Sequence, residues 1–194
     1  MSPARRSHDD VRTALMDAAL RAFASKGYEG ASIRDIATEA GMAPGLLYHY
    51  FPSKHAVLQA LFERSAALVM EAFGRAAAVP DPAARLGALV RVSAQIVREH
   101  QDFWRVSYGV RFQHSVVAGL AVGIAAQSAL YHSLFVALLT ELGRPDPEME
   151  AHLLFGALDG VFQHYVLDPE RYPLDAVIER LILQHGGMPA GKSP

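Results

Sequence analysis

The side chains best suited to bind another molecule lie in one short segment near the N-terminus. On a helix, Gly45 and His49 share the side facing away from the predicted core, and Tyr48 and Tyr50 flank them. A glycine lets the backbone approach a phosphate closely, tyrosine hydroxyls donate to phosphate oxygens, and an imidazole reaches base edges. Lys54, at the start of the next predicted helix, adds a cation beside open backbone N–H groups. Each residue alone also fits ordinary packing or a solvated surface, but the ordered set favours contact with DNA.

Two short helices joined by a tight turn must position these side chains. Ser32 and Asp35 have the spacing of a capping box, which satisfies the open N–H groups at a helix start. Gly41 provides the left-handed backbone that a tight turn requires, and Pro44 fits the first turn of the second helix. The pattern predicts a helix-turn-helix over residues 32–50.

The rest of the chain shows helical periodicity. Apolar residues from Val11 to Phe23 form one stripe that Gly27 ends, and Ser53 is placed to cap a helix running to Ala77. No segment alternates apolar and polar residues with the period of a strand. We therefore expect an all-α protein, with further helices within residues 86–100, 101–114, 148–167 and 174–185.

One segment, residues 112–140, contains no Lys, Arg, Asp or Glu and is long enough to span a membrane. Its middle carries Gln127, Tyr131 and His132, much of the rest is Ala and Gly, and no positive cluster flanks it closely on one side. We therefore expect a helix buried on all sides within a soluble domain, and no membrane partner.

Residues 32–58 resemble the N-terminal signature of the tetracycline-repressor (TetR) family of bacterial regulators. Together with the first helix, the resemblance covers roughly residues 9–60, and the signature is specific. It implies a three-helix DNA-binding domain in residues 1–55 and a larger helical ligand-binding and dimerisation domain in residues 56–185. We expect the small polar tail, 186–194, to be disordered. The matching residues are Ile36-Ala37, Ala40-Gly41, Gly45, Tyr48, Tyr50-Phe51 and Ser53-Lys54.

The resemblance implies a set of DNA contacts and also shows two departures. Ala43 replaces the Ser or Thr that normally caps the second helix, an effect of about 1 kcal/mol. Leu46 stands where the family often has a hydroxyl that touches DNA. Arg5 and Arg6 precede the first helix and form either a basic arm or part of a disordered end. The implied DNA-binding residues are Ser32, Gly45, Tyr48, His49, Tyr50 and Lys54.

A stripe of rings with one cation follows in the predicted helix over residues 101–114. Trp104, Tyr108 and Phe112 fall near one side with Arg111, which suits an apolar pocket with one polar anchor, although core packing also explains the rings. An unpaired buried charge is costly, so Arg111 pairs with either an acidic ligand or a protein carboxylate such as Asp159. The candidate ligand-binding residues are Trp104, Tyr108, Arg111, Phe112, Tyr131, Phe135, Asp159 and Gln163.

The last two predicted helices have the pattern of a self-association surface. The spacing of Gly156 and Gly160 gives a flat strip that a partner helix can approach closely. The resemblance implies that these two helices form a four-helix interface across a twofold axis. That symmetry predicts a palindromic operator, with half-sites spaced by one helical turn or a multiple of it. The expected interface residues are Leu153, Gly156, Ala157, Gly160, Val161, Val177, Ile178 and Leu181.

Composition limits the classes of protein to consider. The chain has 194 residues, 51% of them hydrophobic, which is enough for a large core. The absence of cysteine excludes a disulfide framework and thiol chemistry and fits a reducing cytoplasm, and the polar N-terminus does not read as a secretory signal. The nine histidines are spread out, and no phosphate-cradling glycine loop or nucleophile elbow occurs. We therefore expect no metal, no cofactor and no enzymatic activity.

The net charge of −2 is distributed in a way that permits DNA binding without demanding it. Residues 1–55 carry seven Lys or Arg against six Asp or Glu. We expect a homodimeric repressor that leaves its operator when a small apolar or amphipathic effector shifts the helix beginning at Ser53, with a coupling of typically about 1–3 kcal/mol. Three alternatives stay open: an activator, a helical enzyme or metal protein in which residues 32–50 merely pack, and a structural DNA binder, against which the low charge argues.

Overall fold

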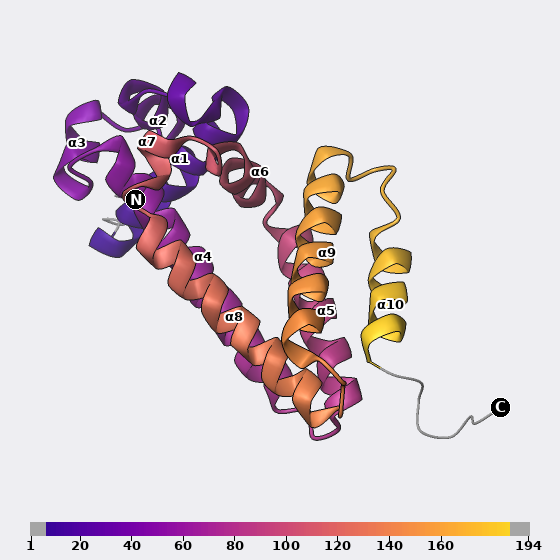
Figure 1. The fold of residues 1–194 in the computed structure, drawn as a ribbon. Coiled ribbons are helices and arrows are strands. Elements are labelled where there is room, and N and C mark those ends of the chain that lie inside the picture. The colour runs from indigo at the N-terminus through magenta and orange to yellow at the C-terminus, as the bar shows by residue number, and fades with distance from the viewer. Residues whose placement is uncertain (1–6, 187–194) are drawn as a thin grey trace, which may run out of the picture. The chain divides into compact units, whose positions relative to one another are not determined.

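The computed structural model describes residues 7–186, except the side chains of residues 114 and 117, and this part contains helices and no strand (Figure 1). The predicted all-α class is therefore confirmed. Arg5, Arg6 and the expected tail beyond residue 186 lie outside the described residues. The helices are α1 (His8–Gly30), α2 (Ile33–Glu39), α3 (Pro44–Tyr50), α4 (Lys54–Ala77), α5 (Pro82–Glu99), α6 (Gln101–Val110), α7 (His114–Val117), α8 (Ala121–Glu141), α9 (Pro147–Leu167) and α10 (Leu174–His185).

The chain divides into two compact units that share helix α4. Of the described residues, unit 1 contains 7–65 and 102–120, and unit 2 contains 66–101 and 121–186. The expected boundary between residues 55 and 56 falls in the same helix, but α6 and α7 belong to unit 1. The ring of Phe103 in α6 meets that of Phe62 edge-on, 5.3 Å between centroids. The hydrophobic periodicity of the sequence does not show that two residues so far apart in the chain are in contact, so it could not predict that α6 belongs to unit 1.

Helix α1 supplies much of the core of unit 1. Ser7 and Asp10 form a capping box at its start. The predicted apolar stripe faces inward, where Leu15 and Phe23 are almost completely buried. Gly27 has a φ of +72°, so the helix breaks where the sequence predicts, and one further helical turn follows the kink.

Helix α4 is one uninterrupted helix of 24 residues, as predicted. The Ser53 hydroxyl accepts the N–H of Ala56 at 3.1 Å and so caps its start. Leu58 is buried within unit 1, and Phe73 is buried within unit 2 beside Tyr131. The helix is roughly 36 Å long at about 1.5 Å per residue. Its residues up to 65 belong to unit 1 and those from 66 onward to unit 2.

Unit 2 is a helical bundle built from α5, α8, α9, α10 and the end of α4. Helix α8 packs along α9, and α10 packs on both α5 and α9. Leu86, Leu139 and Leu154 are fully or almost fully buried in this core. Arg91 of α5 donates to both carboxylate oxygens of Glu179 in α10, at 2.6 and 2.7 Å. This two-pronged ion pair fixes the register of α10 against α5.

Helix α8 differs from the expectation of burial on all sides. Its second half is packed, with Phe135, Leu138 and Leu139 in the core, but Val122 is 85% exposed and Leu130 is also exposed. The helix is long and apolar enough to cross a membrane, and only 17% of its most apolar 18-residue stretch is buried within the protein. The exposed half is rich in Ala and Gly, which lose little by facing water, and apolar composition alone therefore overstated its burial.

Candidate nucleic-acid interface

The start of α2 has the predicted capping geometry. The Ser32 hydroxyl accepts the N–H of Asp35 at 3.1 Å, and the Asp35 carboxylate accepts the N–H of Ser32 at 2.8 Å. Lys26 also donates to Asp35, which together with the Ser32 hydrogen bonds lowers the pKa of Asp35 far below its ordinary value. Ser32 is exposed, and its hydroxyl donates to the Asp35 carboxylate at 2.6 Å.

The turn and the inward side of α3 also follow the prediction. Gly41 has a φ of +64°, and Pro44 is the first residue of α3. Ala43 gives no side-chain cap, although its backbone is extended as a cap requires. Leu47 is completely buried, and Phe51 is almost completely buried at the end of the helix. These contacts fix which side of α3 faces outward.

The outward side of α3 presents the predicted polar and aromatic residues. Tyr48 is 56% exposed, and Gly45 and His49 are also exposed. A Cβ added at Gly45 would meet no other atom within 4 Å, so internal packing does not require a glycine there. Tyr50 is half-buried because the ring of His8 in α1 covers it at 4.5 Å. A partner can therefore approach α3 without any rearrangement of the core.

Lys54 differs from its expected role. Its ammonium group donates to the carbonyl oxygens of Tyr28 at 2.7 Å, Ala31 at 3.1 Å and Glu29 at 3.4 Å. It also lies 4.4 Å from the centre of the Tyr28 ring. An ammonium has three N–H donors, and the three carbonyls engage all of them. Lys54 thus fastens the start of α4 to the end of α1.

One further basic residue, Arg34, lies on α2 and is not among the expected DNA contacts. Arg34 is exposed on α2, two positions after Ser32, and forms no ion pair among the described residues. The nearby Arg21, by contrast, is held by Glu39 at 2.7 Å. The position of Arg34 in the first turn of the first helix of the predicted motif was a usable signal.

Three of the four ligand candidates on or after α6 lie together. The Trp104 and Tyr108 rings are 5.9 Å apart, and the Arg111 guanidinium lies 4.8 Å from the centre of the Tyr108 ring. The indole nitrogen of Trp104 is buried without a hydrogen-bond partner. Phe112 is instead 87% exposed. It follows the end of α6 in a turn, so a helical extrapolation placed it wrongly.

The other four ligand candidates belong to unit 2. Tyr131 is half-buried, its hydroxyl accepts a hydrogen bond from Gln127 at 2.7 Å, and burial raises its pKa to about 12. Phe135 is buried in the core, which supports packing as its role. Asp159 and Gln163 lie one turn apart on α9, half-buried and exposed respectively.

The dimer candidates on α9 and α10 are mostly accessible. Leu153 is 62% exposed, and a Cβ on Gly156 or Gly160 would meet no other atom within 4 Å, so the flat strip is open. Ile178 is an exception: it is 2% exposed because it packs inside unit 2. It has no surface to offer a second copy. The half-buried members of the set are Ala157, Gly160, Val161, Val177 and Leu181.

An all-helical fold with a tight helix-turn-helix and an unpacked polar face on its second helix defines a DNA-binding transcriptional regulator. Residues 15–61 match the family model for bacterial regulatory proteins of the tetR family, and residues 104–184 match that for the tetracyclin repressor-like C-terminal domain. The chain belongs to the tetR family. This is a family of regulators and not of enzymes, so the expectation of no enzymatic activity is confirmed.

Individual relatives agree with this assignment. The chain is 31% identical to the HTH-type transcriptional regulator BetI of Rhizobium meliloti over 78% of its length and 75% of that protein. It is 27% identical to the regulator PksA of Bacillus subtilis over 94% of its length and 91% of that protein. Among solved structures, AibR in complex with isovaleryl coenzyme A and operator DNA has a TM-score of 0.74 at 22% identity, covering 89% of this chain and 96% of that one.

Proposed function

We propose that this regulator is a repressor that binds a palindromic operator as a homodimer and leaves it when a small effector binds. The single observation that carries the DNA-binding part is the outward face of α3, where Gly45, Tyr48 and His49 are exposed and lie outside the core. The His49 ring meets that of Tyr50 edge-on at 5.4 Å, so polar aromatic side chains gather on one accessible helix face, and such groups contact bases and phosphates. The proposed location is the cytoplasm, where its DNA lies, with no membrane partner.

The proposed contacts with DNA divide by chemistry. His49 reads base edges in the major groove, and Tyr48 and Tyr50 donate to phosphates. Arg34, in the first turn of α2, pairs with a neighbouring phosphate. Ser32 is not assigned a phosphate, because its hydroxyl donates to the Asp35 carboxylate at 2.6 Å; it caps α2 beside this contact. Lys54 is not assigned a phosphate, because its donors bind carbonyl groups; it holds the motif in position.

The proposed dimer forms through α9 and α10. The open glycine strip on α9 and the exposed Leu153 support a close helix–helix contact, and Val177 and Leu181 of α10 extend it. Ile178 supports the interface only from within the core. A twofold axis between the copies presents two α3 helices to two half-sites, which makes the operator a palindrome.

The proposed effector has an apolar body and a hydrogen-bond acceptor. Its site is the cluster of Trp104, Tyr108 and Arg111, where two rings provide apolar surface beside a cation. The buried indole N–H of Trp104 lacks an acceptor, and such groups normally have one. The similar AibR structure contains an acyl-coenzyme A ligand, which fits this chemistry. Release follows if the effector prefers a position of α4 that changes the spacing of the two α3 helices.

The DNA-binding proposal is tested by footprinting on the DNA that flanks the chain's own coding region. The expected result is protection of a palindromic site at low protein concentration by the purified dimer. Loss of this protection on adding an effector supports repression by release. A chain that protects no site in this DNA, or that stays monomeric at the concentrations used, would contradict the proposal.

The effector proposal has a built-in probe, because Trp104 is the only tryptophan in the chain. Titration with isovaleryl coenzyme A should change the tryptophan fluorescence and weaken operator binding over the same concentration range. Tyr108→Ala should weaken both responses, whereas Gln95→Ala, at an exposed position on α5, should leave them unchanged. A fluorescence change without any effect on operator affinity would separate ligand binding from regulation.

A further inference from the structure

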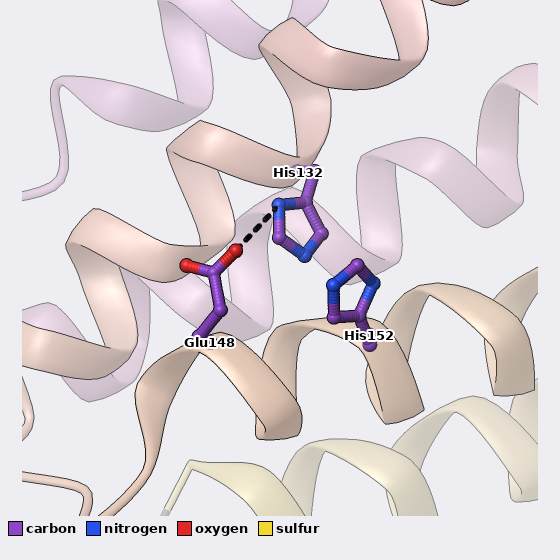
Figure 2. A group of neighbouring side chains, drawn as sticks. All are labelled: His132, Glu148 and His152. Carbon is purple, nitrogen blue, oxygen red and sulfur yellow. Dashed lines mark ion pairs between the residues drawn. The ribbon is translucent and has the colours of Figure 1, made fainter.

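Two helices of unit 2 bring together three side chains that can bind a metal ion (Figure 2). His132 lies on α8, while Glu148 and His152 lie four positions apart on one face of α9. One donor atom from each, a ring nitrogen or a carboxylate oxygen, lies within 4.8 Å of the other two. Along the sequence the histidines are spread out, which is why no metal site is expected from it. The packing of α8 along α9 removes that separation.

The orientation of His132 suits a ligand. Its Nδ1 lies 3.9 Å from the Glu148 carboxylate. Its second nitrogen, Nε2, is buried without a hydrogen-bond partner and faces the ring of His152, 4.1 Å away between centroids (Figure 2). Buried polar atoms without a partner are uncommon, because each loses its hydrogen bonds to water and gains nothing in return. A bound cation satisfies both imidazoles at once.

We propose that His132, Glu148 and His152 form a binding site for a divalent transition-metal ion, of which Zn²⁺ is the best match. Two imidazoles and one carboxylate are ligands that Zn²⁺ prefers, whereas Ca²⁺ and Mg²⁺ take oxygen ligands. Bonds of about 2.0–2.2 Å place the donors of a tetrahedral site roughly 3.4 Å apart. The donors of the cluster lie within 4.8 Å of one another, so they must move closer together to bind an ion. Glu148 and His152 are exposed and free to make that movement.

The charges around the cluster also favour a cation. The neighbouring carboxylate of Glu150 is already held by Arg144 at 2.7 Å and by His185 at 3.1 Å. Glu148, by contrast, pairs with a histidine, so its negative charge is available to a metal ion. Three protein ligands leave the fourth position for water or an anionic group. The bound ion would link α8 to α9, independently of DNA binding or of the proposed effector site.

The experiment measures metal binding by the full-length protein, freed of any histidine tag and treated with a chelator. Titration with Co²⁺ should give visible absorption bands of a four- or five-coordinate ion that saturate at one equivalent per chain, and Zn²⁺ should displace them. His152→Ala and Glu148→Gln, both at exposed positions, should each weaken Zn²⁺ binding at least tenfold. Zn²⁺ should raise the thermal midpoint of the wild type more than that of either variant. His132→Ala is a third variant, secondary because this residue is partly buried.

His100→Ala is the matched control, since His100 is an exposed histidine of the same unit at the end of α5. It should bind Zn²⁺ as the wild type does. The proposal is overturned if the wild type binds Zn²⁺ no more tightly than His152→Ala and Glu148→Gln, or if His100→Ala weakens binding as much as they do.

Discussion

The helix-turn-helix of unit 1 and the α8–α9 pair of unit 2 are both candidate binding regions, but they are specified in opposite ways. In the first, residues a few positions apart set the geometry: Ser32 with Asp35 starts α2, and Gly41 makes the turn. In the second, His132 meets Glu148 only because two long helices pack together. Short-range signals therefore locate the first region, and only tertiary structure locates the second.

The two regions also contain leucines of opposite burial, and replacing them should give the largest expected difference in unfolding free energy. Leu47→Ala empties a fully buried position under α3 and should lower the free energy of unfolding by about 2–5 kcal/mol. Leu153→Ala, on the exposed face of α9, should lower it by less than about 0.5 kcal/mol in the monomer but weaken dimerisation. Denaturant unfolding and sedimentation equilibrium measure the two quantities. Equal unfolding costs for both variants would contradict the assigned packing.

Substitution of Lys54 tests whether its ammonium group stabilises the fold or binds a DNA phosphate. Lys54→Met keeps the aliphatic stem but removes the donors to the three carbonyls, and should cost about 1.5–3 kcal/mol in unfolding free energy. For Lys54→Met, the slope of operator affinity against salt concentration should be the same as in the wild type, because no phosphate contact is lost. Arg34→Met should do the reverse, with little change in stability and a slope smaller by about one. A reduced slope for Lys54→Met would restore the phosphate contact that the resemblance implies.

The caps of the two short helices offer a smaller, paired effect. Ser32→Ala removes an observed cap and should destabilise the protein by about 1 kcal/mol. Ala43→Ser adds a hydroxyl at a cap position whose backbone already has the required extended conformation, and should stabilise it by about 0.5–1 kcal/mol. Thermal unfolding of both variants checks the signs. A destabilising Ala43→Ser would show that the start of α3 is constrained by something other than its cap.

The contribution of Tyr131 in α8 to folding stability should depend on pH only at alkaline pH. Burial raises the pKa of Tyr131 from 10.0 to about 12, so the folded state holds this proton more tightly than the unfolded state. Its contribution to stability is therefore fully present below pH 10 and is lost as the pH rises towards 12. Tyrosinate absorbance of the wild type and Tyr131→Phe should show that the variant lacks one late-ionising group. If both titrate alike, Tyr131 is not buried as described.

The features that the sequence predicts correctly depend on residues close together in the chain. The all-α class, the helix break at Gly27 and the cap at Ser32 were predictable, because each depends on neighbours within one helical turn. The role of Lys54 was not, since its partners lie 23 to 26 positions earlier in the chain. Nor was the exposure of the first half of α8, because composition does not say which elements cover a helix.

The most direct test of the central claim compares His49→Ala with the wild type for affinity to the footprinted operator and to unrelated DNA of equal length. Fluorescence anisotropy at one salt concentration gives both constants. If the outward face of α3 reads bases, operator affinity should fall by about 1–3 kcal/mol while affinity for unrelated DNA stays the same. An unchanged ratio of the two affinities, in a variant that remains folded and dimeric, would contradict the account.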